Sequence, residues 1–199
     1  MNSQNDEERV ILDYFGDFKG TFLDLGANDG LTLSNTYALA ERGWMGVLVE
    51  PSPMAFGALA YNYANTRFIV YQLALGKYNG VFPFYESGTL LNQGDAALVS
   101  TLNKSNKNKF EKVVDYHEVE VECMTWDKFI IECPVKHFDF ISMDIEGSEL
   151  DVLPLMDLSK TRLLCIEHNS KDHLRKQYEK YLSGFSLIHI TSENLIYGR

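Results

Sequence analysis

Apolar and polar positions alternate along the chain with two different periods. Short apolar runs of strand length are separated by longer segments with helical periodicity, which is typical of a parallel sheet covered by helices on both faces. We predict strands at 21–25, 46–50, 67–73, 138–144 and 162–167, and helices at 7–15, 33–42, 54–63, 148–156 and 171–182. Two last apolar runs, 185–191 and 195–197, predict an antiparallel hairpin. The expected fold is therefore α/β, with a mostly parallel sheet of six or seven strands.

The alternation stops between residues 81 and 124. Val81–Glu86 has the pattern of an additional strand, Ser87–Lys109 is polar with little periodicity, and Tyr116–Met124 alternates like an edge or antiparallel strand. A long polar segment inside a compact domain is usually functional or mobile. We therefore expect residues 81–124 to be an inserted strand and lid region. Residues 1–19 are expected to form an N-terminal helical extension of a single domain spanning 1–199.

Composition narrows the class of protein. At 45% hydrophobic and 23% charged residues, the chain has the balance of a globular domain with a substantial core. No apolar run approaches the roughly 20 residues that span a bilayer, so we expect no membrane partner. The first residues, MNSQNDEERV, lack the basic and apolar regions of a secretory signal, which predicts a cytoplasmic protein. Three cysteines without C-x-x-C spacing disfavour a disulfide framework or a zinc site.

The net charge of -10 disfavours a nucleic-acid partner, because nucleic-acid binders draw much of their affinity from basic surfaces. One basic cluster, NKSNKNKFEK, carries four lysines: Lys104, Lys107, Lys109 and Lys112. This cluster is either a solvated loop and helix start or a binding surface for an anionic acceptor.

The clearest candidate site is the loop after the first predicted strand, Asp24-Leu25-Gly26-Ala27-Asn28-Asp29-Gly30. Its spacing is D-x-G-x-x-x-G, which differs from the dinucleotide fingerprint G-x-G-x-x-G. Gly26 permits a sharp turn and the close approach of a ligand. Asp24 can accept hydrogen bonds from a ligand ammonium group and would repel a phosphate, so the loop suits the amino-acid part of S-adenosylmethionine.

A second acid supports a nucleoside ligand. Glu50 ends the next strand, 26 residues after Asp24, where a carboxylate can bind both ribose hydroxyls. NAD-binding proteins share this feature. After the third strand, Gln72 and Ala74 lie where an adenine is expected. The residues predicted to bind the cofactor are Asp24, Gly26, Ala27, Asn28, Gly30, Glu50, Pro51, Gln72, Ala74 and Asp144.

Acidic residues also follow the later strands. Asp144 ends the fourth main strand, Glu146 comes two residues later, and Glu167 with His168 ends the fifth. Two interpretations remain open for these residues. Asp144, Glu146 or His168 acts as a general base toward an acceptor, or Asp144, Glu146 and Glu167 bind Mg²⁺, which prefers oxygen ligands. On a continuing strand, Glu167 and His168 face opposite sides, so only one of them should enter the site.

The motifs FLDLGANDG, LVEPSP and ISMDIEGSELDVL occur in that order, with YQLALG, IEHN and a final NLIYG. With these motifs the chain resembles the FkbM-like methyltransferases over roughly residues 20–199, and DIEGSEL is their most specific part. The resemblance implies a Rossmann-like class I methyltransferase fold with seven strands, S-adenosylmethionine as donor, and methylation of a hydroxyl on a sugar or small natural product. Asp29 fills the variable place of the family pattern G-A-N-x-G. Ser87–Lys109 carries no family signature, which leaves the acceptor open.

Other functions compete with this one. A methyltransferase of the same fold can act on nitrogen or on a macromolecule. A NAD-linked oxidoreductase would need the middle glycine that the loop lacks. A non-catalytic nucleoside-binding module would not need the pair Asp144 and Glu146.

Overall fold

The structure is a computed structural model that describes residues 2–89 and 97–199. In these residues, seven strands form one sheet in the order β3-β2-β1-β7-β8-β10-β9. The strands are β1 (Thr21–Leu25), β2 (Met45–Val49), β3 (Ile69–Tyr71), β7 (Phe140–Met143), β8 (Leu163–Glu167), β9 (Ser186–Ile190) and β10 (Asn194–Gly198). Neighbours are parallel from β3 to β8, and β10 is antiparallel to both β8 and β9. The mostly parallel sheet with a C-terminal hairpin is confirmed.

The strand order reverses between β1 and β7. From β1 the chain moves outward to β2 and β3, and it returns to the other side of β1 at β7. In parallel α/β sheets, ligands bind beyond the carboxyl ends of the strands at such a switch point. Leu25 pairs with both Val49 and Met143, and Met143 pairs with Ile166. The ends of β1, β2, β7 and β8 therefore lie at one edge of the sheet.

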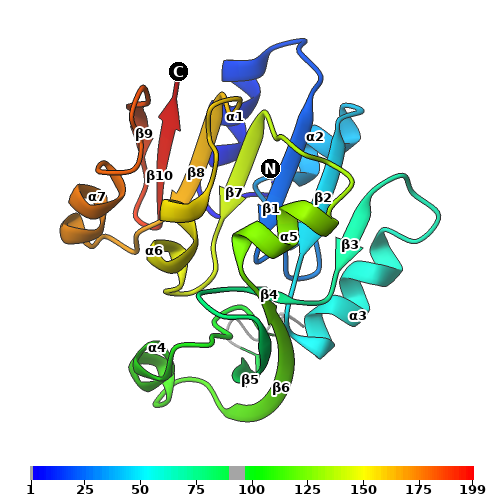
Figure 1. Cartoon of the computed structure of the whole chain (residues 1–199), viewed down its shortest axis with the longest axis vertical. Coiled ribbons are helices and arrows are strands. Elements are labelled where there is room, and N and C mark those ends of the chain that lie inside the picture. The colour runs from blue at the N-terminus through cyan, green and yellow to red at the C-terminus, as the bar shows by residue number, and fades with distance from the viewer. Residues whose placement is uncertain (1, 90–96) are drawn as a thin grey trace.

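Helices cover both faces of this sheet, as predicted (Figure 1). The helices α1 (Glu7–Phe15), α2 (Tyr37–Glu41) and α3 (Pro53–Asn62) pack on one face. The helices α5 (Trp126–Glu132), α6 (Glu149–Val152) and α7 (Asp172–Tyr178) pack on the other, and a short 3-10 turn, Leu153–Leu155, follows α6. The central strands are thus buried on both sides, which explains their continuous apolar sequence.

The start of α2 differs from the prediction. The helix begins at Tyr37 instead of residue 33, because Leu33 has a positive φ of 54° and the hydroxyl of Ser34 accepts from the N–H of Tyr37. Local side-chain hydrogen bonds of this kind compete with the helix. The preceding residues form a loop that lies against the end of β1.

The inserted region forms a second sheet. Among the described residues, β4 (Ala74–Leu75), β6 (Tyr116–Met124) and β5 (Gly80–Ser87) lie in the order β4-β6-β5, and α4 (Lys104–Phe110) joins β5 to β6. The strand β6 is antiparallel to β5 and central in its sheet, not at its edge. Figure 1 shows this sheet and α4 beyond the carboxyl ends of the main parallel strands. Residues 90–96 of the predicted lid lie outside the described residues.

The N-terminal helix belongs to the core. Ile11 and Phe15 of α1 are buried against Phe140 of β7 and Cys165 of β8.

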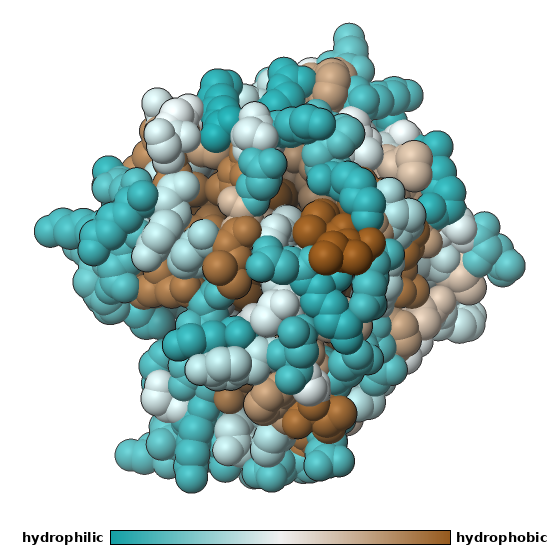
Figure 2. Space-filling model, in the orientation of Figure 1, coloured by the Kyte–Doolittle hydropathy of each residue, from teal (hydrophilic) through white to brown (hydrophobic). Residues whose placement is uncertain are grey.

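The face drawn in Figure 2 is mostly hydrophilic, with separate hydrophobic patches. In residues 2–89 and 97–199 no helix combines the length and apolar character needed to cross a membrane.

Candidate active site

The glycine loop after β1 is shaped by the end of β7. Gly26 has a φ of +83°, and a Cβ atom here would lie 1.8 Å from the carbonyl oxygen of Asp144, so only glycine fits. The N–H groups of Gly26 and Ala27 donate to the carbonyl of Val49, over 3.0 and 3.1 Å. The space that Gly26 leaves open is therefore taken by the protein's own backbone, and not by a ligand as its sequence position suggested.

A cavity of about 280 Å³ lies beside this loop. Ten of the residues predicted for the cofactor, the base or the metal line it: Asp24, Gly26, Ala27, Asn28, Glu50, Pro51, Ala74, Asp144, Glu146 and Glu167. Phe84, Leu102 and Phe110 of the inserted region line it as well. The cavity therefore brings the ends of β1, β2, β7 and β8 together with the second sheet.

Three predicted residues lie outside this cavity. Gly30 packs on α3, where a Cβ atom would meet the Tyr63 ring at 2.4 Å. Gln72 is exposed, because its neighbour Leu73 takes the inward position and adjacent side chains in extended chain point to opposite sides. His168 is buried with Nε2 3.1 Å from the carbonyl oxygen of Thr191. These three residues are not carried into the proposed site.

Glu50 joins two loops at the end of β2. Its Oε2 accepts from the N–H of Asn28 at 2.9 Å, and its Oε1 accepts from the N–H of Ser52 at 2.8 Å. Burial raises the pKa of Glu50 to about 7, against the lowering effect of the hydrogen bonds from Ser52 and Asn28. Each carboxylate oxygen keeps a further acceptor position, which suits the binding of hydroxyl groups.

Asp24 is the second buried acid on the β1 side of the cavity. The hydroxyl of Thr36 donates to Asp24 Oδ2 over 2.6 Å. Burial raises the pKa of Asp24 to about 6, although the bond from Thr36 lowers it. A buried carboxylate with so little compensation favours a cationic ligand.

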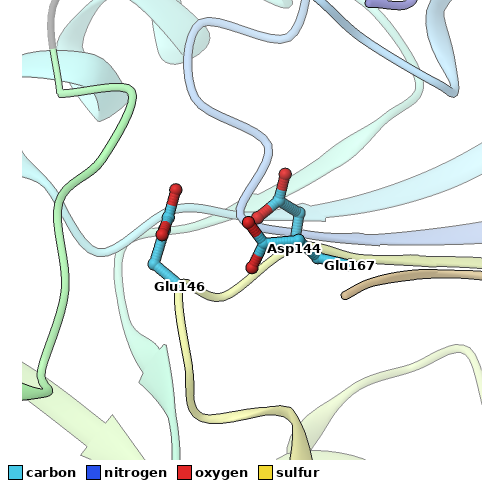
Figure 3. A group of neighbouring side chains, drawn as sticks. All are labelled: Asp144, Glu146 and Glu167. Carbon is cyan, nitrogen blue, oxygen red and sulfur yellow. The ribbon is translucent and has the colours of Figure 1, made fainter. Parts of the chain in front are cut away.

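Three carboxyl groups form a cluster at the ends of β7 and β8. Asp144, Glu146 and Glu167 each offer an oxygen within 4.8 Å of the others. Figure 3 shows the carboxyl groups of Asp144 and Glu167 beside each other, with Glu146 on the loop that follows β7. Burial raises the pKa of Asp144 to about 7, and the nearby carboxylate of Glu149 adds to the effect. Burial and the charge of Asp144 raise the pKa of both Glu146 and Glu167.

The inserted region holds Glu146 in place. Glu146 has a left-handed φ of 50°, which is unusual for a residue with a side chain and is often found at functional sites. Its carbonyl oxygen accepts from Thr101 Oγ1 and Asn106 Nδ2, both at 2.7 Å. Asn106 Nδ2 also lies 3.1 Å from Glu146 Oε2, and Lys109 donates to Asn106 Oδ1. Residues distant in sequence thus orient one acid of the cluster.

Glu149 closes the turn between β7 and α6. Its Oε1 accepts from the N–H groups of Ile145 and Gly147, each at 3.1 Å. These bonds give Glu149 a role in the turn at the start of α6, where an acid also complements the positive end of the helix dipole.

Sequence reasoning missed four residues that orient the site: Thr36, Ser52, Thr101 and Asn106. The Ser-Asn-Thr run before α2 and the Ser-Pro pair before α3 are recognisable helix-start signals, but they do not reveal contact with Asp24 or Glu50. Asn106 lies in a segment without periodicity, and no local signal indicates its partner.

Comparison with known proteins identifies the family. A model of the family described as the methyltransferase FkbM domain matches residues 24–185. The 2-O-methyltransferase NoeI of Sinorhizobium fredii is 26% identical over 158 residues, which are 75% of this chain and 63% of that protein. The chain therefore spans less than two thirds of the length of this relative.

Solved structures share the fold at low sequence identity. A methyltransferase FkbM from Methylobacillus flagellatus KT has a TM-score of 0.56 and 18% identity, over 91% of this chain and 44% of that chain. The ribosomal protein L11 methylase from Lactobacillus delbrueckii subsp. bulgaricus has a TM-score of 0.53 and 12% identity, over 97% of this chain and 77% of that chain. The family match includes both the loop after β1 and the acid cluster, and the chain belongs to the family of the methyltransferase FkbM domain.

Proposed function

We propose that this protein is an S-adenosylmethionine-dependent methyltransferase that acts on a hydroxyl group of a sugar or another small acceptor. One observation carries the proposal. Asp24 and Glu50, which end neighbouring parallel strands, line the same cavity as the acid cluster of Asp144, Glu146 and Glu167. This arrangement supports a nucleoside site with a proton acceptor beside it.

Asp24 and Glu50 bind the two polar ends of the cofactor in this proposal. Asp24 accepts from the ammonium group of the methionyl part, and the free acceptor positions of Glu50 take the ribose hydroxyls. Ala74, with the neighbouring Leu73 and Leu75, provides an apolar wall for the adenine. Asn28 and Pro51 line the same part of the cavity through the loops that Glu50 connects.

The acid cluster prepares the acceptor. When bound, the donor supplies a methyl group attached to a positively charged sulfur. The new C–O bond forms as the C–S bond breaks, and the sulfur leaves as a neutral thioether. A carboxylate of the cluster accepts the proton of the acceptor hydroxyl. The pKa of Asp144, raised to about 7, suits this task at neutral pH because the group is both ionised and basic there.

Mg²⁺ is a second candidate for the cluster. Asp144, Glu146 and Glu167 offer the carboxylate oxygens that this ion prefers, and the buried Asp144 Oδ1 has no hydrogen-bond partner among the described residues. The donor set fits the ion, which would lower the pKa of a coordinated hydroxyl. Loss of turnover after EDTA treatment and its recovery with Mg²⁺ would assign the cluster to a metal; unchanged turnover would assign it to a base.

Two observations favour oxygen of a small molecule or glycan as the acceptor. The relative from Sinorhizobium fredii is a 2-O-methyltransferase, and Asp144, Glu146 and Glu167 bring to the cavity carboxylates that can remove the proton of a hydroxyl. The net charge of -10 disfavours a nucleic-acid acceptor.

Ligand binding tests the proposal directly. Thermal unfolding in S-adenosylhomocysteine should be shifted upward, because a ligand at about 100 times its Kd stabilises the folded state by about 2.7 kcal/mol. NAD at the same concentration should give no shift, and Asp24→Ala and Glu50→Ala should abolish the shift with S-adenosylhomocysteine. Stabilisation by NAD alone would overturn the proposal. A screen of hydroxylated sugars and small natural products with labelled donor then identifies the acceptor.

A further inference from the structure

A buried acid of the inserted sheet contacts the segment that follows Glu50. Glu86 belongs to β5 and is only 4% exposed. Its Oε1 accepts from the hydroxyl of Ser52 at 2.5 Å and from the N–H of Met54 at 3.1 Å. Its Oε2 lies 3.2 Å from Nε2 of the exposed His117. Glu86 thus contacts the turn between β2 and α3 from outside the main sheet.

Ser52 connects Glu86 to Glu50. The side chain of Ser52 is fully buried; its hydroxyl donates to Glu86 and accepts from the N–H of Ala55 at 3.1 Å. The backbone N–H of Ser52 donates to Glu50 Oε1. The hydroxyl of Ser52 is thus held by one donated and one accepted hydrogen bond, which together fix the orientation of its side chain.

The chain of hydrogen bonds continues to the glycine loop. Glu50 Oε2 accepts from the N–H of Asn28, so Glu86, Ser52, Glu50 and Asn28 form one connected series from the second sheet to the loop after β1. The series has a cost, because the carboxylates of Glu86 and Glu50 repel each other and the charge of Glu86 contributes to the raised pKa of Glu50. Capping of α3 alone does not require a second buried acid at this place, since Ser52 already accepts from Ala55.

We propose that Glu86 is a positioning residue for the cofactor: through Ser52 it holds Glu50 in the orientation that binds the ribose. The inference rests on the proposed function and deepens it by adding a residue of the inserted sheet to the nucleoside site. It follows that the inserted sheet is coupled to cofactor affinity and is not an independent cover for the acceptor.

The experiment compares three substitutions of Glu86. In Glu86→Ala, the Kd for S-adenosylhomocysteine, measured by calorimetry, should rise about tenfold, because the bonds that Glu86 accepts from Ser52 and Met54 are lost and the turn beside Glu50 is no longer held. Glu86→Gln should stay within about threefold of wild type, because its amide oxygen can accept from both Ser52 and Met54. Glu86→Asp keeps the charge but is one carbon shorter, so its Kd should lie between the two.

Kinetics separate positioning from a general structural role. For Glu86→Ala, KM for the methyl donor should rise while kcat at saturating donor stays near wild type. His117→Ala is the matched control, because the exposed His117 side chain lies beside Oε2 of Glu86, whereas Ser52 and Met54 donate to Oε1; its Kd should equal that of wild type. If Glu86→Ala does not fold, the Glu86→Asp variant carries the same test.

Three results would overturn the inference: wild-type Kd in folded Glu86→Ala, a loss in Glu86→Gln equal to that in Glu86→Ala, or a fall in kcat with unchanged KM. Failure of the wild-type protein to bind S-adenosylhomocysteine is a different outcome, because it overturns the proposed function itself.

Discussion

Two regions of this protein bury carboxylates in different ways. Burial alone would raise the pKa of Glu7 at the start of α1, but hydrogen bonds from Thr191, Asn194 and Asn5 hold it below its ordinary value. In the cavity, Asp144 Oδ1 is buried without a hydrogen-bond partner among the described residues, and burial raises the pKa of Asp144 to about 7. The hydrogen bonds to Glu7 outweigh the effect of its burial, which suits an acid that stabilises the fold, whereas Asp144 keeps one buried oxygen without a partner that a ligand can use.

The largest expected effect is the loss of turnover when Asp144 is replaced. Asp144→Asn should lower turnover about 10²- to 10⁴-fold, the usual contribution of a general base, while the Kd for S-adenosylhomocysteine changes little. The pKa of Asp144 is raised on folding, so the contribution of this group to stability should fall as pH rises from about 4 to about 7. The variant should show a flatter pH dependence in urea unfolding. Retained turnover would move the base to another residue.

For Glu7, substitution is expected to lower stability, and the pH dependence has the opposite sign to that of Asp144. Glu7→Gln should lower the free energy of unfolding at pH 7 by about 1–3 kcal/mol, because a buried network loses its charge-assisted hydrogen bonds. The pKa of Glu7 is lowered on folding, so this stability is present above the ordinary pKa of 4.5 and disappears as pH falls through the folded value. Asp13→Asn, in the exposed part of the same helix, is the control for urea unfolding at pH 7 and pH 3.5. Equal stability of both variants would contradict the comparison.

A smaller effect should come from the residue that orients Glu146. Asn106→Ala removes the hydrogen bonds to the carbonyl and carboxyl groups of Glu146, and turnover should fall about tenfold, near the value of one such bond. The cofactor Kd should not change. Asn108→Ala replaces an exposed residue of the same helix and should behave as wild type. A loss of cofactor affinity in Asn106→Ala would show that α4 acts on the other half of the cavity.

The last effect, which disappears above pH 6, concerns pH and cofactor binding. The pKa of Asp24 is raised to about 6, so below pH 6 the free protein must release a proton before the carboxylate can bind an ammonium group. The Kd for S-adenosylhomocysteine should therefore rise by up to about tenfold per pH unit below 6. Calorimetry from pH 5 to pH 8 measures this, and Asp24→Asn should remove the slope. A flat wild-type profile would place the ammonium group away from Asp24.

The sequence predicted the main sheet and the acids at its strand ends because both depend on short-range patterns. Buried strands require continuous apolar runs, and parallel strands expose their last residues at one edge. Asp24, Glu50, Asp144 and Glu167 could therefore be found from their positions after such runs. The prediction failed where side-chain contacts determine the local conformation. The helix α2 begins later than predicted because of Ser34, and Gln72 points outward.

The amino-acid sequence alone thus determined the α/β architecture, the family resemblance and the residues at the carboxyl edge of the sheet. Only the tertiary structure decided how the second sheet lies against that edge, and with it the contacts of Glu86 with Ser52 and of Asn106 with Glu146. These partners are separated by 34 and 40 residues. Local patterns record which side chains are buried, but contacts across such distances depend on how packed elements dock.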